Sequence, residues 1–317
     1  MTRRDLFKFA SIGTAGLILA PGLSLLEPQQ AHAASYEITT ISDRSFLGGQ
    51  SITIDDKLCS SVPDSVSVSG STLPRLYNSF GIGIPDGYGV IPGREYRANL
   101  NTNIEDATFK AIYNCVGTFN GRNVGCETII SNAVECLHNG QEQSYGATFN
   151  YKSVAFQRFS LWWRTIWLIR YESADIEQRF FYSDTNETIS CKDMIVTVGS
   201  LNHYEDFKNQ GNVGEGVQLP SNVKTVYLFD KSEVVSNVTV HGRKTYTDII
   251  CGDVSKSEHG SDQEDGFRAR AVSWVVPGDT VKYKAVSTYG YFGLNITFQP
   301  IANTTPINPI KSYKLSN

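Results

Sequence analysis

Beyond residue 34 the chain is built from short runs in which apolar and polar residues alternate. Alternation with a period of two over about four to eight residues predicts half-buried β-strands, because successive side chains of a strand point to opposite faces. Turn residues separate the runs, which recur at roughly ten-residue spacing. This pattern predicts an all-β fold, an antiparallel β-sandwich of Ig-like or jelly-roll-like type.

The clearest hairpin comprises residues 107–130, with Asn120-Gly121 between its two strands. A two-residue Asn-Gly loop favours a type I′ turn, which sets Phe119 opposite Arg122. Counting outward from that turn places Cys115 opposite Cys126, within the distance that a disulfide spans. A longer turn would shift this register. Residues 127–137 also allow a helix.

The most apolar stretch of the mature chain is residues 156–172. Both of its faces are largely apolar, which predicts one central strand buried on both sides, with a helix as the rival interpretation. A second hairpin is predicted at residues 177–191, with its turn at 183–187. Further strands are predicted at residues 36–41, 51–55, 65–70, 194–201, 224–229, 234–242, 267–276, 280–288 and 294–301.

The N-terminus has the three-part layout of an export signal: basic residues, an apolar run and the small residues around Ala33. Cleavage after Ala33 is expected, and residues 2–8 resemble a twin-arginine motif. A membrane anchor is the alternative, but glycines and a proline interrupt the run. The expected organisation is a signal (1–33), a Pro/Gly/Ser-rich segment packed on the sandwich (34–98), the β-sandwich region as one large or two small domains (99–300), and a polar tail (301–317).

The charge is weakly acidic, with a net value of −4 and no runs of Lys or Arg. Binding to nucleic acid or to an anionic membrane is therefore not expected. No segment of the mature chain approaches the length of a transmembrane helix.

Six cysteines lie in the mature part, and an even number in an exported chain predicts disulfides. Cys115 and Cys126 are the predicted pair. The other four cysteines allow three sets of pairs, and the choice among these stays open: Cys59, Cys136, Cys191 and Cys251. A close Cys-x₂₋₄-Cys pair is not present, which argues against zinc and against a thioredoxin-like redox motif.

No catalytic constellation stands out, and no cofactor or metal is expected. A cysteine transpeptidase would need Cys191 as a thiolate near His138, but a disulfide partner is the favoured interpretation of Cys191. The four mature histidines are scattered, and no carboxylate pair is singled out among the many acidic residues. Aromatic residues in Gly-rich, loop-like surroundings form the candidate contact surface: Tyr88, Tyr289, Tyr291 and Phe292.

Residues 101–130 (NTNIEDATFKAIYNCVGTFNGRNVGCETII) resemble a recurring segment of β-sandwich (Ig-like) domains in Gram-positive cell-surface adhesins. Residues 180–190 (FFYSDTNETIS) resemble the hairpin that follows it there, and residues 197–202 (TVGSLN) resemble the next strand and turn. The resemblance spans about residues 97–230. The cysteines at 115, 126 and 191 depart from the family pattern. The resemblance implies a binding role and no catalytic residue.

The sequence thus predicts a secreted or envelope-associated bacterial protein that binds an extracellular glycan or protein without catalysis. Two alternatives remain open. The first is an exported enzyme that acts on polysaccharide through an acidic site, and the second is a structural component of the envelope.

Overall fold

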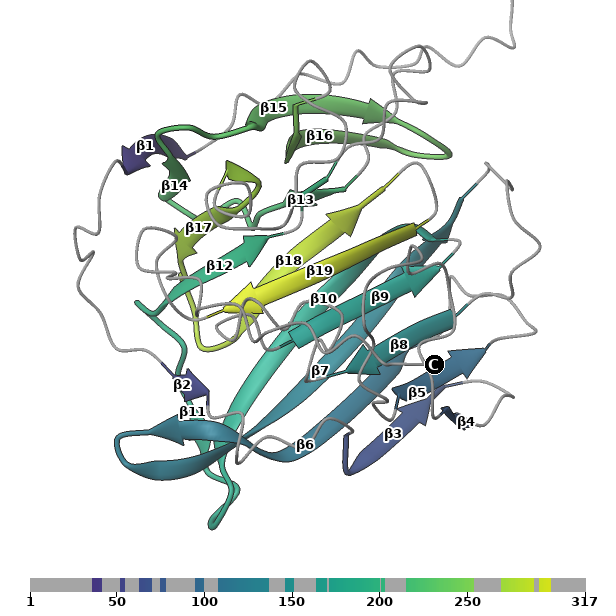
Figure 1. Cartoon of the computed structure of the whole chain (residues 1–317), viewed down its shortest axis with the longest axis vertical. Coiled ribbons are helices and arrows are strands. Elements are labelled where there is room, and N and C mark those ends of the chain that lie inside the picture. Colours follow the sequence, from purple (N-terminus) through teal and green to yellow (C-terminus); the bar gives the residue numbers. More distant parts are fainter. Residues whose placement is uncertain are drawn as a thin grey trace, which may run out of the picture. The chain divides into compact units, whose positions relative to one another are not determined.

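A computed structural model describes residues 36–41, 52–54, 63–69, 75–77, 95–99, 108–136, 146–150, 164–169, 171–199, 201–202, 215–253, 269–287 and 291–297. The chain divides into two compact units, Met1–Ala31 and His32–Asn317, and every described residue belongs to the second. Its strands form two sheets, here called sheet A and sheet B (Figure 1).

Sheet A contains nine strands. Their order across the sheet is β1 (Glu37–Ile41), β14 (Thr225–Phe229), β17 (Val272–Val275), β12 (Ile195–Gly199), β19 (Tyr291–Thr297), β9 (Arg164–Ile169), β8 (Gly146–Asn150), β5 (Glu95–Asn99) and β4 (Arg75–Tyr77).

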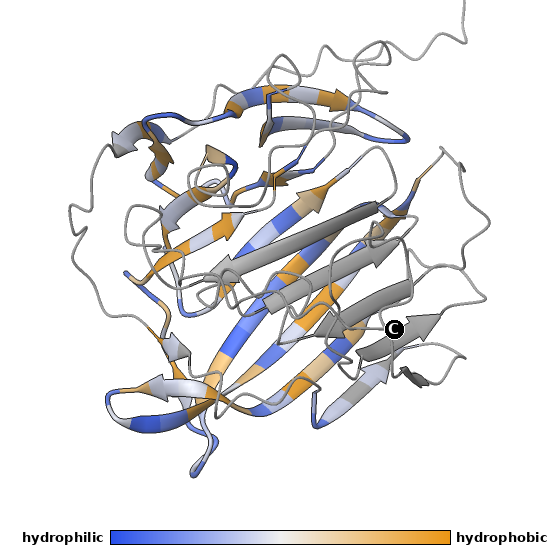
Figure 2. Cartoon of the chain, viewed as in Figure 1, coloured by the Kyte–Doolittle hydropathy of each residue, from blue (hydrophilic) through white to orange (hydrophobic). Residues whose placement is uncertain are grey.

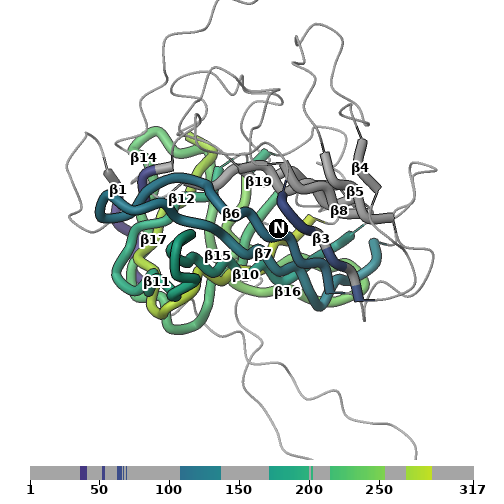
Figure 3. Tube along the Cα trace, turned by 90° about the horizontal axis from the view of Figure 1, so that it is seen from below, coloured from purple at the N-terminus to yellow at the C-terminus, as the bar shows by residue number. Residues whose placement is uncertain are grey.

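Sheet B contains ten strands, including the three longest described. Their order is β15 (Val234–His241), β16 (Thr245–Gly252), β13 (Gly216–Gln218), β18 (Val281–Val286), β10 (Tyr171–Tyr182), β7 (Arg122–Glu135), β6 (Phe109–Phe119) and β2 (Thr53–Ile54). In addition, β11 (Thr188–Ile189) pairs with β10, and β3 (Ser65–Val68) lies along β6 (Figure 3). Of the described pairings, β1 with β14 is parallel and the others are antiparallel, so the predicted all-β antiparallel class is confirmed.

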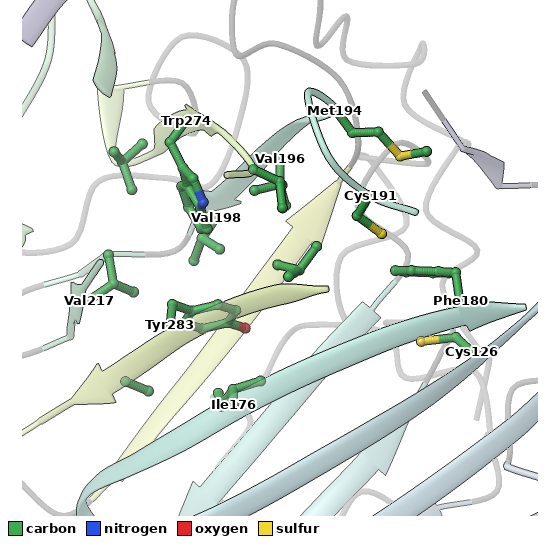
Figure 4. Packing of buried hydrophobic residues seen from close by; sticks show 14 of the residues in the cluster. Cys126, Ile176, Phe180, Cys191, Met194, Val196, Val198, Val217, Trp274 and Tyr283 are labelled. Carbon is green, nitrogen blue, oxygen red and sulfur yellow. The ribbon is translucent and has the colours of Figure 1, made fainter. Parts of the chain in front are cut away.

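One hydrophobic core takes side chains from both sheets. Val196, Val198 and Trp274 come from sheet A, and Ile176, Phe180 and Tyr283 come from sheet B (Figure 4). The rings of Trp274 and Tyr283 meet edge to face at a centroid distance of 5.9 Å, which joins β17 to β18 across the core. The sheets therefore pack through a shared apolar layer, as in a β-sandwich.

The other face of sheet B carries charged residues, and the alternation of polar and apolar positions is visible along β7 and β10 (Figure 2). Glu177 receives a hydrogen bond from Arg179 at 2.8 Å and lies 3.5 Å from Lys282. Desolvation acts to raise the pKa of Glu177, but the hydrogen bond and the two positive charges outweigh it, so the pKa is lowered. Because these pairs are solvent-exposed, each contributes at most about 1 kcal/mol.

Two predictions about single segments are corrected. The stretch predicted as one strand over residues 156–172 changes sheet: β9 ends at Ile169 in sheet A and β10 starts at Tyr171 in sheet B. Residues 156–163 lie outside the described residues. The helix considered for residues 127–137 is not formed, because β7 continues through Glu135 and pairs with β10.

The predicted bond between Cys115 and Cys126 is not made, because strand β6 is bulged. Phe119 faces Arg122 as expected, but three residues, 114–116, stand opposite the single Gly125, so Tyr113 faces Cys126. A bulge of this kind moves every residue beyond it out of the register that the turn sets. No disulfide joins the five cysteines that the structure describes, namely Cys115, Cys126, Cys136, Cys191 and Cys251, and Cys59 lies outside the described residues.

Within the described residues, no helix is long and apolar enough to cross a membrane.

Candidate binding surface

Two hairpin turns meet at one end of sheet B and form a surface that we call the hairpin tip (residues 119–123 and 182–187; Figure 1). The first turn joins β6 to β7. Asn120 and Gly121 have φ angles of 51° and 75°, the left-handed values that a type I′ turn requires at both central positions. Asn and Gly adopt these values at low cost, so the local sequence determines this turn.

The second turn follows β10. The amide of Asn186 donates to the carbonyl of Tyr182 at 2.8 Å, and the amide of Tyr182 donates to the carbonyl of Glu187 at 2.9 Å. Asn186 itself has a φ of 60°. These bonds close the turn that was predicted at residues 183–187.

Arg122 fastens the two turns together. Its guanidinium donates to Asp184 Oδ1 at 2.7 Å and to Thr185 Oγ1 at 3.2 Å, and it lies 3.6 Å from the centroid of the Tyr182 ring. A planar guanidinium makes all three contacts at once, which the single ammonium of a lysine would not. The ring of Phe119 packs against Tyr182, with the centroids 6.4 Å apart.

The electrostatics of the tip follow from this arrangement. The hydrogen bond from Arg122 lowers the pKa of Asp184, and the same bond raises the pKa of Arg122. Both groups are exposed, so this pair orients the turns more than it stabilises the fold.

Ser183 links the second turn to strand β7 and to the β6 bulge. The amide of Ser183 donates to the carbonyl of Asn123 at 2.9 Å, and the Ser183 hydroxyl donates to the carbonyl of Asn114 within the bulge. The backbone amide of the same residue, Asn114, donates to Asp64 Oδ2 at 2.7 Å. Side chains distant in the sequence therefore satisfy both backbone polar groups of Asn114 in the bulge.

Gly125 makes room for this close approach. A Cβ at that position would lie 2.3 Å from the Phe181 ring and 2.7 Å from the carbonyl oxygen of Tyr113. The Phe181 ring and strand β6 thus pack so closely against residue 125 that no side chain larger than that of glycine fits there.

The exposed groups of the tip are amides, hydroxyls and carboxylates, suited to hydrogen bonds with a polar ligand: Asn120, Asn123, Asp184, Thr185, Asn186 and Glu187. Sequence reasoning identified both turns but named none of these residues as a site. The turn signals were visible, whereas the contact between the turns was not.

The aromatic residues predicted as a contact surface are not part of this tip. Tyr291 and Phe292 belong to strand β19, opposite Ile169 and Leu168 of β9, and so are not in a loop as the sequence implied. Tyr88 and Tyr289 lie outside the described residues. As contact residues, the four remain a prediction.

The structure gives little support to chemistry at Cys191. Burial, followed by the neighbouring Cys126 and Asp279, raises the pKa of its thiol to about 12, so it stays protonated at neutral pH. His138 lies outside the described residues. Among the residues that the structure describes, no group of three or more His, Cys, Asp or Glu side chains is placed to hold a metal ion.

A buried polar cluster surrounds Arg270, which is 3% exposed. Its guanidinium donates to Glu233 Oε2 and to Asn202 Oδ1, each at 3.1 Å, and the Asn202 amide donates to Glu215 Oε2 at 2.9 Å. Mutual bonding of this kind is how buried charges are accommodated, and it fits a structural role in joining chain segments.

No family model matches the chain, and neither does any curated protein. Two solved structures show a distant likeness. The N-terminal domain of the Streptococcus gordonii adhesin Sgo0707 has 13% identity and a TM-score of 0.45, with 86% of this chain and 67% of that chain covered. The adhesin domain of PrgB from Enterococcus faecalis has 9% identity and a TM-score of 0.41, with 79% of this chain and 88% of that chain covered. These values are too low to indicate a function.

Proposed function

We propose that the protein is an adhesin-like binding protein of the bacterial envelope or exterior, and that the hairpin tip is its contact surface. The observation that carries the proposal is the fastening of two separate turns by Arg122, which holds exposed amide, hydroxyl and carboxylate groups in a fixed arrangement. Two of the segments that resemble Gram-positive adhesins, residues 101–130 and 180–190, build the tip.

Rigidity favours binding, because side chains that are already ordered lose less conformational entropy when a ligand docks. Loops on a rigid β-scaffold commonly carry recognition for this reason. Amide and carboxylate groups exchange hydrogen bonds with hydroxyls and peptide groups, so the proposed ligand is an extracellular glycan or protein.

Export follows from the proposed signal at residues 1–33, by the twin-arginine route. The protein recovered from the cell exterior should begin at Ala34, which N-terminal sequencing or intact mass determines. Recovery of the uncleaved chain in the cytoplasm would contradict this part of the proposal.

The function is tested by measuring binding of the full chain to arrays of glycans and immobilised extracellular-matrix proteins. We expect a saturable signal that the double substitution Asn123→Ala/Glu187→Ala weakens at least about tenfold, by loss of hydrogen bonds to the ligand. Thr239→Ala is the matched control, because Thr239 is exposed on β15, outside the tip.

Other results would replace the proposal. Binding that survives the double substitution but is lost in Tyr88→Ala or Tyr291→Ala would move the contact surface to the aromatic residues. Consumption of a glycan would establish the polysaccharide enzyme instead. Binding only to other envelope components of the same organism would indicate the structural role.

A further inference from the structure

Strand β1 forms one edge of sheet A, beside β14 (Figures 1 and 3). All five of its residues pair in unbroken register, from Glu37 opposite Thr225 to Ile41 opposite Phe229. Tyr36, next to the strand, packs against the main core, and burial followed by the charge of Asp248 raises its pKa to about 12. The strand is therefore fixed in place at its start.

The hydrogen-bonding direction of β1 is fixed by one contact. The amide of Glu37 donates to the carbonyl of Lys224 at 2.8 Å, toward β14. Because backbone groups alternate in direction along a strand, Thr39 and Ile41 also bond toward β14. Ile38 and Thr40 direct their N–H and C=O groups away from β14, to the side on which none of the described strands pairs with β1. Ile38 is 41% exposed, and Thr40 is exposed as well.

Open edges invite pairing with another strand, and proteins usually blunt them with bulges, prolines or lysines. One edge of sheet B is blunted in this way, since β15 has register shifts between Val235 and Val238 and between Val238 and Val240. Strand β1, with the sequence EITTI, has none of these features.

We propose that β1 pairs antiparallel with β1 of a second copy of this chain, about a two-fold axis at Thr39. In this register Ile38 faces Thr40 of the other copy, and both residues present outward N–H and C=O groups, so two such pairs make four hydrogen bonds. The two Thr39 side chains face each other, which is a favourable cross-strand pair. Sheet A then continues from one copy into the other.

The charges of β1 are compatible with this pairing. Glu37 faces Ile41 of the other copy, and the two Glu37 residues lie about 13 Å apart along the strands, beyond the screening length at physiological salt. A neighbouring register centred on Ile38 or on Thr40 would leave fewer outward groups of β1 paired. The sequence EITTI is thus self-complementary in the one register that its backbone direction favours.

Sedimentation of the full chain tests the proposal, because a contact this small gives a weak dimer that forms with rising concentration. Thr40→Pro removes an outward N–H from each copy while leaving the pairing with β14 in place, and proline is tolerated at such edge positions. The dissociation constant should rise at least about tenfold. Thr39→Pro is the variant to compare with Thr40→Pro. It removes an N–H that is directed at β14, so it should lower the urea concentration at which the chain unfolds.

A covalent readout does not depend on proline being tolerated. Under mild oxidation Thr39→Cys should give a disulfide-linked dimer above the wild-type background, because the two residues face each other within disulfide reach. Glu37→Cys should not, since its counterpart is about 13 Å away. A chain that stays monomeric at the highest concentration, a dimer that Thr40→Pro does not weaken, or equal cross-linking of the two cysteine variants would overturn the proposal.

Discussion

A hairpin turn is anchored near each end of strand β10, and the two anchoring contacts differ in kind. At its C-terminal end, the exposed Arg122 guanidinium binds Asp184 just beyond Tyr182. At its N-terminal end, the Glu172 carboxylate is 1% exposed and accepts the backbone N–H groups of Arg243 at 2.7 Å and Lys244 at 3.1 Å, in the turn between β15 and β16.

The difference lies in what replaces each contact when it breaks. When the exposed Arg122–Asp184 pair breaks, water solvates both groups at little cost in free energy. The pair therefore sets the geometry of the turns more than the stability of the fold. The buried carboxylate has no such replacement, and the hairpin that it binds shares a small second core with Val286 of β18, to which the hairpin contributes Val240, Tyr246, Ile249 and Cys251. The contact at the Glu172 end is therefore part of the buried structure, although the turn residues 242–244 are themselves exposed, whereas the contact at the tip is exposed and leaves the tip free to carry a binding surface.

The largest effect is expected from Glu172→Ala. Removing the carboxylate leaves a buried cavity and deprives two N–H groups of their acceptor, which should lower the free energy of unfolding by roughly 3 kcal/mol. Urea unfolding followed by circular dichroism measures this. Glu187→Ala, which truncates an exposed carboxylate, serves as the control. A loss equal to that of the control would contradict the contrast between the two ends.

Gly242→Ala tests the same contact between Glu172 and the β15–β16 turn by changing the turn instead of the carboxylate. A Cβ at residue 242 would lie 2.2 Å from the carboxyl carbon of Glu172 and would force the carboxylate out of place, at a cost of roughly 2 kcal/mol. Gly278→Ala is the matched control, because a Cβ there meets no atom within 4 Å. If both glycine variants unfold at the same urea concentration, the turn is not held as tightly as the contacts indicate.

Arg122→Ala should affect the tip without unfolding the protein. Its urea midpoint should stay close to that of Glu187→Ala, because the ion pair is exposed. Hydrogen exchange of the amides in residues 183–187 should nevertheless become faster, since the turn loses its anchor. Arg122→Lys should restore little of the protection, because an ammonium does not reproduce the guanidinium contacts.

The smallest effect is the pH dependence of the tip. The pKa of Asp184 is lowered from its usual 3.8, mainly by the hydrogen bond from Arg122. The contact therefore contributes fully above the unfolded value and is lost as the pH falls through the lower folded value. An NMR titration of the Asp184 carboxyl carbon should show this low pKa, and in Arg122→Ala the pKa should move up toward 3.8. An unchanged titration would mean that Arg122 does not govern this carboxyl.

Local chemistry explains which features were predictable. Asn120-Gly121 specifies its turn because few other residues adopt positive φ at both positions, and alternation along residues 109–113 specifies the buried face of β6. The break between β9 and β10 was missed, because residues buried in either sheet of a sandwich look equally apolar.

The cysteine pairing and the site required the tertiary structure. The bulge that separates Cys115 from Cys126 is held by Asp64 and Ser183, which lie far from it in the sequence, and it accommodates Phe181 against Gly125. Likewise, Glu172 looks like any polar strand residue until the β15–β16 turn folds over it. The sequence by itself determined most of the strands and both turns of the tip, because these depend on the preferences of neighbouring residues, although strands such as β8 and β16 were not predicted. Only the tertiary structure decided register beyond the bulge, burial of charge and the meeting of the two turns, because these depend on contacts between residues distant in the chain.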